Sequence, residues 1–252
     1  MLDSNGHISV CRMLADKYPF IKRLCLVRKG GVFVGLRRGV ELPVFGAGVV
    51  EAAPRRERSD AAESRQRVLD AARGLFAERS VDAVSMHEIG RAAGVGQGTL
   101  YRRYEHKGAL CSALLAEEIE GFVDEVRRRA GGRGSALGRL KWFLGRLARF
   151  NDDNAALLGA IRDAAGGGRR VEMYGNPFYS WLRGTVAALV RQAMNEGAMM
   201  GELDVECVAD ALLATLNIDL YLYQRHELGM SRERVTRSLH ALLDGLRPGP
   251  AS

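Results

Sequence analysis

Apolar residues recur at spacings of three and four from Glu63 almost to the C-terminus, and this spacing places them on one face of an α-helix. The first such stripe consists of Val68, Leu69, Ala72, Leu75 and Phe76. Two later stripes, over residues 205–220 and 235–246, follow Asp204 and Ser231, which are residue types that cap helices. No stretch in this part keeps the strict alternation of a β-strand. The sequence therefore predicts an all-α fold.

Two short helices joined by a tight turn are predicted near the middle of the chain. Ser85 is followed three residues later by Glu88, which is the arrangement of a capping box at a helix start. Gly94 then permits the left-handed backbone of a sharp turn, and a second short helix follows over residues 97–104. This order predicts a helix-turn-helix over about residues 85–104, a motif that docks its second helix in the major groove of DNA.

The outer face of the second helix carries residues suited to DNA. Leu100 and Tyr104 share the inner face, so the residues opposite them are free for bases and phosphates. The amide of Gln97 matches the edge of adenine, and Gly98 allows the backbone to approach the groove. Hydroxyl and basic groups nearby can bind phosphates. The predicted DNA contacts are Ser85, Gln97, Gly98, Thr99, Tyr101, Arg102, Arg103 and Lys107.

A nucleotide-binding glycine loop is the competing interpretation of this stretch. Gly94, Gly96 and Gly98 suggest it, but the GxGxxG pattern requires glycine at position 99, which is Thr99. That pattern also follows a β-strand, and no strand is predicted before it. Each exposed residue alone fits an ordinary solvated helix, so the DNA interpretation depends on their joint placement after a capped helix and a turn.

Residues 65–110 resemble the DNA-binding domain of the TetR/AcrR family of transcriptional regulators, through AGV, GTLY and the aromatic residue and lysine that follow. The resemblance implies a three-helix DNA-binding head, a larger helical ligand-binding and dimerisation body, and a homodimeric repressor that a small molecule releases from a near-palindromic operator. It gives a DNA-contact role to every predicted residue except Arg102. Ser80, Gly96 and Gly108 depart from the usual pattern, and none of the three removes a predicted contact.

Charge divides the chain into unequal parts. Residues 1–60 carry 11 Lys/Arg and 6 Asp/Glu, residues 61–110 carry 8 and 6, and residues 111–252 carry 18 of each. The formal net charge of +7 therefore resides in the first two parts, which favours a polyanionic partner for them. We expect a poorly ordered extension and linker in the first part, the helix-turn-helix domain in the second, and a helical regulatory and dimerisation domain in the third.

The first fifty residues differ from the rest. Their short apolar runs can form a hairpin, but an isolated hairpin is marginal in water, so an extension is favoured. Residues 52–63 have the composition of a charged linker. A translation start at Val49 or Val50 is an alternative that would leave residues 1–50 outside the natural protein. The mass of the native protein would decide between them.

The third part concentrates large apolar side chains between predicted helices, where small-molecule pockets are common. The candidate pocket residues, for a largely apolar ligand, are Trp142, Phe143, Phe150, Phe178, Trp181, Met194, Asn217 and Tyr221. The same set of large apolar side chains also fits an ordinary hydrophobic core. The last two predicted helices have stripes wide enough to cover a core and a second copy of the chain, so we expect a homodimer through them.

Several other classes of protein are disfavoured. The four cysteines form no CxxC pair and the five histidines form no HxxxH pair, so we expect no metal, no cofactor and no catalytic residue. The longest uncharged runs, of about ten residues, are shorter than a membrane span, so we expect a cytoplasmic protein with no membrane partner. The rival hypothesis is a helical enzyme or protein-interaction module that retains a helix-turn-helix for packing.

Overall fold

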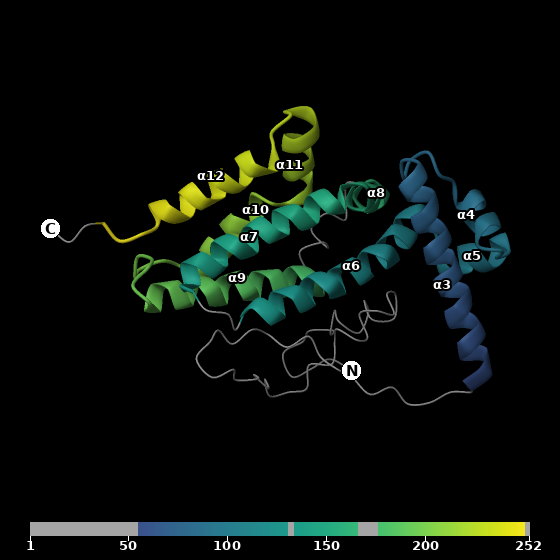
Figure 1. Cartoon of the computed structure of the whole chain (residues 1–252), viewed down its shortest axis with the longest axis horizontal. Helices are drawn as coiled ribbons and strands as arrows, with labels where there is room; N and C mark the ends of the chain where they lie inside the picture. Colours follow the sequence, from purple (N-terminus) through teal and green to yellow (C-terminus); the bar gives the residue numbers. More distant parts are fainter. Residues whose placement is uncertain (1–54, 131–133, 166–175, 250–252) are drawn as a thin grey trace, which may run out of the picture.

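The computed structural model describes residues 55–130, 134–165 and 176–249, which form helices and turns with no β-strand (Figure 1). The helices are α3 (Arg55–Glu78), α4 (Met86–Ala92), α5 (Gln97–Arg103), α6 (Lys107–Ala130), α7 (Ala136–Asp153), α8 (Ala155–Ala165), α9 (Pro177–Asn195), α10 (Val205–Ala214), α11 (Ile218–Leu222), the π-helix η2 (Tyr223–Glu227) and α12 (Arg232–Gly245). The all-α prediction is confirmed. The extension expected over residues 1–50 lies outside the described residues.

Two hydrophobic clusters organise these helices into a head and a body. The head, made of α3, α4, α5 and the start of α6, encloses Val68, Leu69, Ala72, Val84, Met86, Ile89, Ala93, Leu100, Tyr104, Leu110 and Leu114. The body, made of the rest of α6 and of α7 to α12, packs around Phe122 and Trp181. Figure 1 shows α6 running from the body to the head, and this helix contributes to both clusters. One continuous helix therefore joins the two parts.

Local sequence signals set most of the helix starts. The side chains of Ser85, Asp204 and Ser231 accept hydrogen bonds from backbone N–H groups in the first turns of α4, α10 and α12, which confirms the three predicted caps. Asn176 caps α9, and Pro177 occupies its first turn, where a missing N–H has no cost. These capped ends satisfy donors that the helices themselves leave free.

Two predicted boundaries are wrong. Helix α3 begins at Arg55, so most of the expected linker over residues 52–63 is helical. The single helix expected over residues 205–220 is broken, because α10 ends at Ala214 and Asn217 caps α11, its side chain accepting from the Asp219 N–H over 3.0 Å. The apolar stripe continues across this break, which is why the spacing alone did not reveal it.

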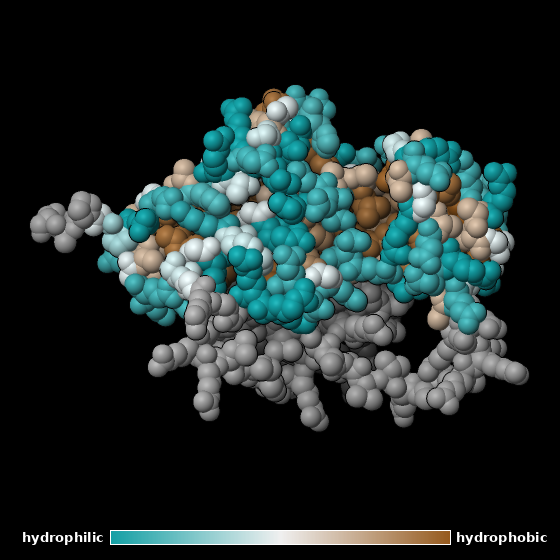
Figure 2. Space-filling view, viewed as in Figure 1, coloured by the Kyte–Doolittle hydropathy of each residue, from teal (hydrophilic) through white to brown (hydrophobic). Residues whose placement is uncertain are grey.

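The surface of the described residues is mostly hydrophilic in the view of Figure 2, with hydrophobic residues showing between α8 and α3 and near the end of α11. Large apolar side chains that remain exposed are Tyr101, Met200, Leu220, Tyr223, Leu228 and Leu242. Among the described helices, none combines the length and the apolar composition that crossing a bilayer requires.

Candidate nucleic-acid interface

Helices α4 and α5 form a helix-turn-helix held by a short turn. Gly94 has a φ of 63°, the left-handed conformation predicted for it, and the Val95 N–H donates to the Gly90 carbonyl over 2.9 Å. Leu100 and Tyr104 are buried in the head cluster, as predicted. Their burial fixes the rotation of α5 about its axis, so the opposite face of this helix points to solvent.

The outward face of α5 consists of Gly98, Thr99, Tyr101 and Arg102, which are all exposed. Tyr101 has 48% of its surface accessible, so its ring and hydroxyl can reach a partner. A Cβ atom added at Gly98 would meet no atom within 4 Å, so nothing in the described protein obstructs the approach of another backbone there. Four of the eight predicted contacts thus share one open polar face.

Ser85 instead serves the cap of α4. Its hydroxyl accepts from the Glu88 N–H over 3.2 Å and donates to Glu88 Oε2 over 2.7 Å. Hydrogen bonds from the Ser85 backbone and side chain, followed by the one from Arg79, lower the pKa of Glu88 from 4.5 to about 2. The carboxylate therefore keeps its charge and holds the hydroxyl within the capping box.

Gln97 and Arg103 each donate a hydrogen bond to the protein, although Arg103 stays exposed. The Gln97 amide donates from Nε2 to the His87 carbonyl over 3.2 Å, and Arg103 donates from Nη1 to the Ala61 carbonyl on α3 over 2.7 Å. The prediction that the Gln97 amide faces a base edge does not match this geometry, because one of its N–H groups already bridges α5 to α4. Both residues hold α5 against its neighbours.

Lys107 lies at the first position of α6 and also points inward. Its ammonium group donates to the carbonyls of Val81, Asp82 and Val84, over 2.8, 3.2 and 3.1 Å. The predicted phosphate contact at this residue is therefore not supported by the geometry. The sequence could not show this, because the carbonyls belong to a loop more than twenty residues earlier.

Sequence reasoning missed Gly90, which sets how closely α4 and α5 approach. A Cβ atom added there would lie 2.5 Å from Gln97 Nε2 and 3.3 Å from the Val95 carbonyl oxygen. The available signal was a glycine inside a short predicted helix, where this residue is unfavourable unless packing requires it. Gly90 thus belongs to the assembly of the motif.

The candidate ligand residues of the body do not form one pocket. Phe143, Phe150, Phe178 and Trp181 surround Phe122, with ring centroids 5.0 to 6.1 Å from its own. These separations are those of aromatic rings in direct contact, so the rings fill the interior. The interpretation as hydrophobic core, which the sequence left open, describes these four residues.

The remaining candidates are dispersed. Asn217 caps α11, and the buried Tyr221 hydroxyl lies 2.9 Å from both the Ala148 carbonyl oxygen and Asp152 Oδ1, to which it can donate. Met194 is partly buried at the edge of the body cluster. None of Asn217, Tyr221 and Met194 lines the cavity between α6, α7 and α9, and their role in a pocket stays a prediction.

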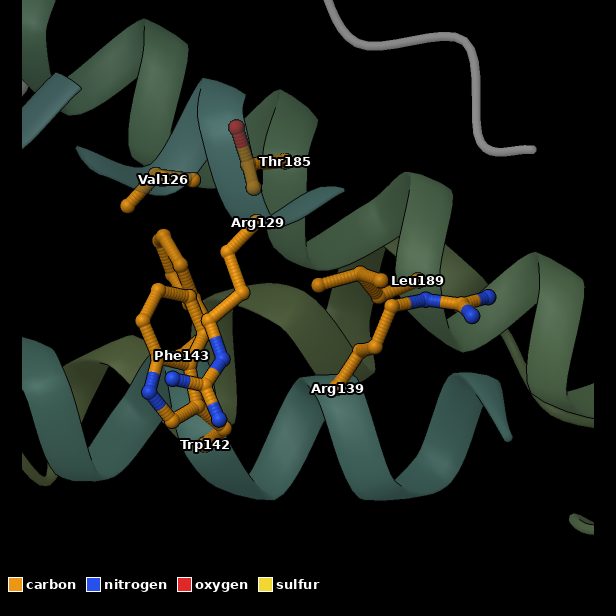
Figure 3. Close-up of a pocket in the computed structure, with 7 residues that line it drawn as sticks. All are labelled: Val126, Arg129, Arg139, Trp142, Phe143, Thr185 and Leu189. Carbon is orange, nitrogen blue, oxygen red and sulfur yellow. The ribbon is translucent and has the colours of Figure 1, made fainter. Parts of the chain in front are cut away.

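A small cavity of about 20 Å³ lies between α6, α7 and α9, and it has room for about one water molecule (Figure 3). Its lining consists of Val126, Arg129, Arg139, Trp142, Phe143, Thr185 and Leu189. The Arg129 guanidinium lies 4.7 Å from the centroid of the Trp142 ring, while Figure 3 shows the guanidinium of Arg139 extending away from that ring. Of the predicted pocket residues, Trp142 and Phe143 line this cavity.

Features typical of a catalytic site are sparse in the described residues. No group of three His, Cys, Asp or Glu side chains within them is placed to hold a metal ion. Burial raises the pKa of the Cys111 thiol to about 11, and a hydrogen bond with Asp204 raises the pKa of the exposed Cys207. Both shifts oppose the thiolate form that a nucleophilic cysteine needs.

Comparisons with known proteins agree with the helix-turn-helix. Residues 68–114 match the family model described as bacterial regulatory proteins, tetR family. An HTH-type transcriptional regulator of Staphylococcus aureus (strain bovine RF122 / ET3-1) is 33% identical over 125 residues, which cover 50% of this chain and 66% of that protein. The matched region thus spans slightly less than two thirds of the relative.

Two solved structures resemble the whole described fold. A TetR-family transcriptional regulator from Pectobacterium atrosepticum has a TM-score of 0.59 at 20% identity, over 77% of this chain and 99% of that one. FadR of Thermus thermophilus, a TetR-family transcriptional repressor in complex with lauroyl-CoA, has a TM-score of 0.58 at 21% identity, over 75% and 98%. At these identities the likeness is one of fold.

Proposed function

The chain belongs to the tetR family of bacterial regulatory proteins, and from this premise we propose that it is a DNA-binding transcriptional regulator. The observation that carries the proposal is the exposed polar face of α5, whose inner face is locked by buried Leu100 and Tyr104. Thr99 and Arg102 would bind phosphates, and Tyr101 would contact a phosphate or a base. Gly98 would let the backbone of α5 approach the floor of the major groove.

We propose that the regulator is a homodimer formed through α11, η2 and α12. Leu220, Tyr223 and Leu242 on these elements are large apolar side chains with 43%, 52% and 58% of their surface exposed. A second copy related by two-fold symmetry would cover them. The two α5 helices would then reach half-sites about 34 Å apart, one turn of DNA, so the operator would be near-palindromic.

A ligand-responsive repressor is the form of regulation that we propose. Thermus thermophilus FadR, with the same fold, is a repressor seen in complex with lauroyl-CoA. In this chain the cavity next to Trp142 lies against α6, which continues into the head. A largely apolar ligand that widens this cavity would favour a different placement of α6 and so lower DNA affinity by linkage. Such a protein would act in the cytoplasm and would need no catalytic residue.

Selection of duplexes from a random-sequence pool tests the proposal. We expect the full-length protein to enrich a near-palindromic sequence and to bind it with an affinity that falls steeply with salt, by a slope of about 0.9 per phosphate contacted. Failure to enrich any sequence, or binding that does not depend on salt, would exclude a sequence-specific regulator. Selection from fragments of the source genome would then identify the controlled genes.

A further inference from the structure

The ammonium group of Lys107 is fully occupied by the protein itself. An ammonium has three N–H donors, and the structure supplies three carbonyl acceptors for them, those of Val81, Asp82 and Val84. All three distances are within the normal range for an N–H···O hydrogen bond. To reach a phosphate, this ammonium would have to leave all three carbonyls, of which that of Val81 also accepts from the Val84 N–H over 3.4 Å.

These three carbonyls lie in the loop between α3 and α4, just before the Ser85 cap. Val81 and Val84 are buried, so the loop is anchored in the head as well as bound by Lys107. The loop delivers the chain to α4, and α4 in turn places α5 through the Gly90 carbonyl and the His87 carbonyl. A displacement of this loop would therefore reach the exposed face of α5 through α4.

The residue after Lys107 joins α6 to the body. A Cβ atom added at Gly108 would lie 2.4 Å from Ala164 Cβ and 3.2 Å from the Ala160 carbonyl oxygen, so α6 and α8 leave no room for a side chain here. The first turn of α6 is consequently fixed on one side to the loop before α4 and on the other side to α8. The adjacent residues Lys107 and Gly108 therefore connect the helix-turn-helix with the body.

We propose that Lys107 is a positioning residue for DNA recognition, which aligns α4 and α5 for the operator through the α3–α4 loop and does not contact a phosphate. The inference rests on the proposed function, because it describes how that same DNA-binding face is held. A phosphate contact and a positioning role differ in one measurable respect. A lost phosphate contact weakens binding to every sequence and lowers the salt slope, whereas a misaligned recognition helix weakens binding to the preferred sequence.

The test compares Lys107→Met with the wild-type full chain on two probes. One probe is the duplex that the wild-type protein selects from a random pool, and the other is a duplex of scrambled sequence. Binding to each is measured between about 50 and 200 mM salt, at a temperature where circular dichroism shows the variant to be folded. Lys141→Met, which removes the other described lysine from its ion pair with Asp244 in the body, is the matched control. Arg102→Gln on the open face of α5 serves as the reference for a lost phosphate contact.

We expect Lys107→Met to bind the selected duplex about tenfold more weakly, as expected when one base contact is misaligned. Its affinity for the scrambled duplex and its salt slope should equal those of the wild type and of Lys141→Met. A salt slope lowered by about 0.9, with both duplexes bound more weakly, would identify a phosphate contact and overturn the inference. Unchanged affinity for the selected duplex would reduce Lys107 to a purely structural role and would overturn it too.

A second variant covers the case in which Lys107→Met does not fold. Lys107→Arg keeps the positive charge but replaces the compact ammonium with a larger planar group that cannot donate to the three carbonyls in the same way. We expect the same selective loss on the selected duplex, and wild-type affinity in this variant would contradict positioning. If the wild-type protein itself selects no duplex, the proposed function fails, and this outcome is separate from any difference among the variants.

Discussion

Ser85 and Glu88 cap the start of α4 reciprocally. The Ser85 N–H donates to Glu88 Oε2 over 2.8 Å, and the Glu88 N–H donates to Ser85 Oγ over 3.2 Å. Arg79 adds an ion pair of 3.0 Å to the other carboxylate oxygen. Two N–H groups that the helix leaves free are thereby satisfied at the point where the chain enters the helix-turn-helix.

This cap makes the stability of the head depend on pH. The pKa of Glu88 in the folded protein is about 2, below its ordinary value of 4.5, so the folded state stabilises the charged form. Its contribution is present above pH 4.5 and is lost as the pH falls from 4.5 toward 2. We expect Glu88→Gln to lower the unfolding temperature most near neutral pH, with the difference from wild type shrinking toward pH 2 in a thermal melt series.

Glu118→Gln provides the control for this series, because Glu118 is an exposed residue of α6 that takes no part in the capping box. If Glu118→Gln lowers the unfolding temperature by as much, and with the same pH dependence, as Glu88→Gln, then the loss of any surface carboxylate has this effect. This result would contradict the role of the Ser85–Glu88 pair.

Arg102 offers a direct measure of DNA contact. It is exposed on the open face of α5, so Arg102→Gln removes one charge without disturbing the buried side of the helix. We expect the slope of log affinity against log salt to fall in magnitude by about 0.9, as for one lost phosphate contact. Arg149→Gln on the exposed surface of α7 is the control, and an equal slope in wild type, Arg102→Gln and Arg149→Gln would remove Arg102 from the interface.

The parts of the fold that the sequence predicted are those with local causes. Ser85, Asp204 and Ser231 accept hydrogen bonds from residues two or three positions later, and Gly94 adopts its left-handed turn within four residues. Such signals are complete within a short window of sequence. The inner and outer faces of α5 can also be predicted from the sequence, because helical geometry alone sets which residues lie opposite Leu100.

The side-chain environments that differ from the sequence-based expectation have long-range causes. The hydrogen bonds of Lys107 depend on carbonyls that carry no side-chain signal and lie 23 to 26 residues earlier. The aromatic residues of the body fit both a pocket and a hydrophobic core in the sequence, because whether rings such as Phe150 and Phe178 enclose a space or fill it depends on the packing distance between helices. Composition does not determine that distance.

Gly108 should tolerate no side chain. In Gly108→Ala the new Cβ would lie 2.4 Å from Ala164 Cβ, so α6 and α8 must separate, and overpacking of this kind costs about 1–3 kcal/mol of unfolding free energy. Gly121→Ala on the same helix is the matched control, because a Cβ there meets nothing within 4 Å and should stabilise α6 by about 0.5–1 kcal/mol. Urea unfolding of both variants measures the difference.

A second substitution can show whether the contact with Ala164 causes the stability lost in Gly108→Ala. Ala164→Gly removes the atom that the new Cβ meets, so the double variant should recover part of the stability lost in Gly108→Ala. Strict additivity of the two substitutions, or a Gly108→Ala protein as stable as Gly121→Ala, would show that the α6–α8 approach is looser than the structure describes.

The proposed dimer surface can be separated from the folded core of one chain. Tyr223 and Leu242 are more than half exposed, so Tyr223→Ser and Leu242→Ser should change the unfolding free energy of the monomer by no more than about 0.5 kcal/mol. Burial of one such side chain contributes about 1.5 kcal/mol to the free energy of association. A two-fold interface contains each residue twice, so one substitution removes about 3 kcal/mol. This loss raises the dimer dissociation constant roughly a hundredfold. Sedimentation equilibrium measures this change.

Tyr101→Ser is the control, because Tyr101 is a similarly exposed aromatic residue in the head, and this variant should leave the dimer intact. A dimer dissociation constant that changes equally in Tyr101→Ser and Tyr223→Ser would place the interface elsewhere.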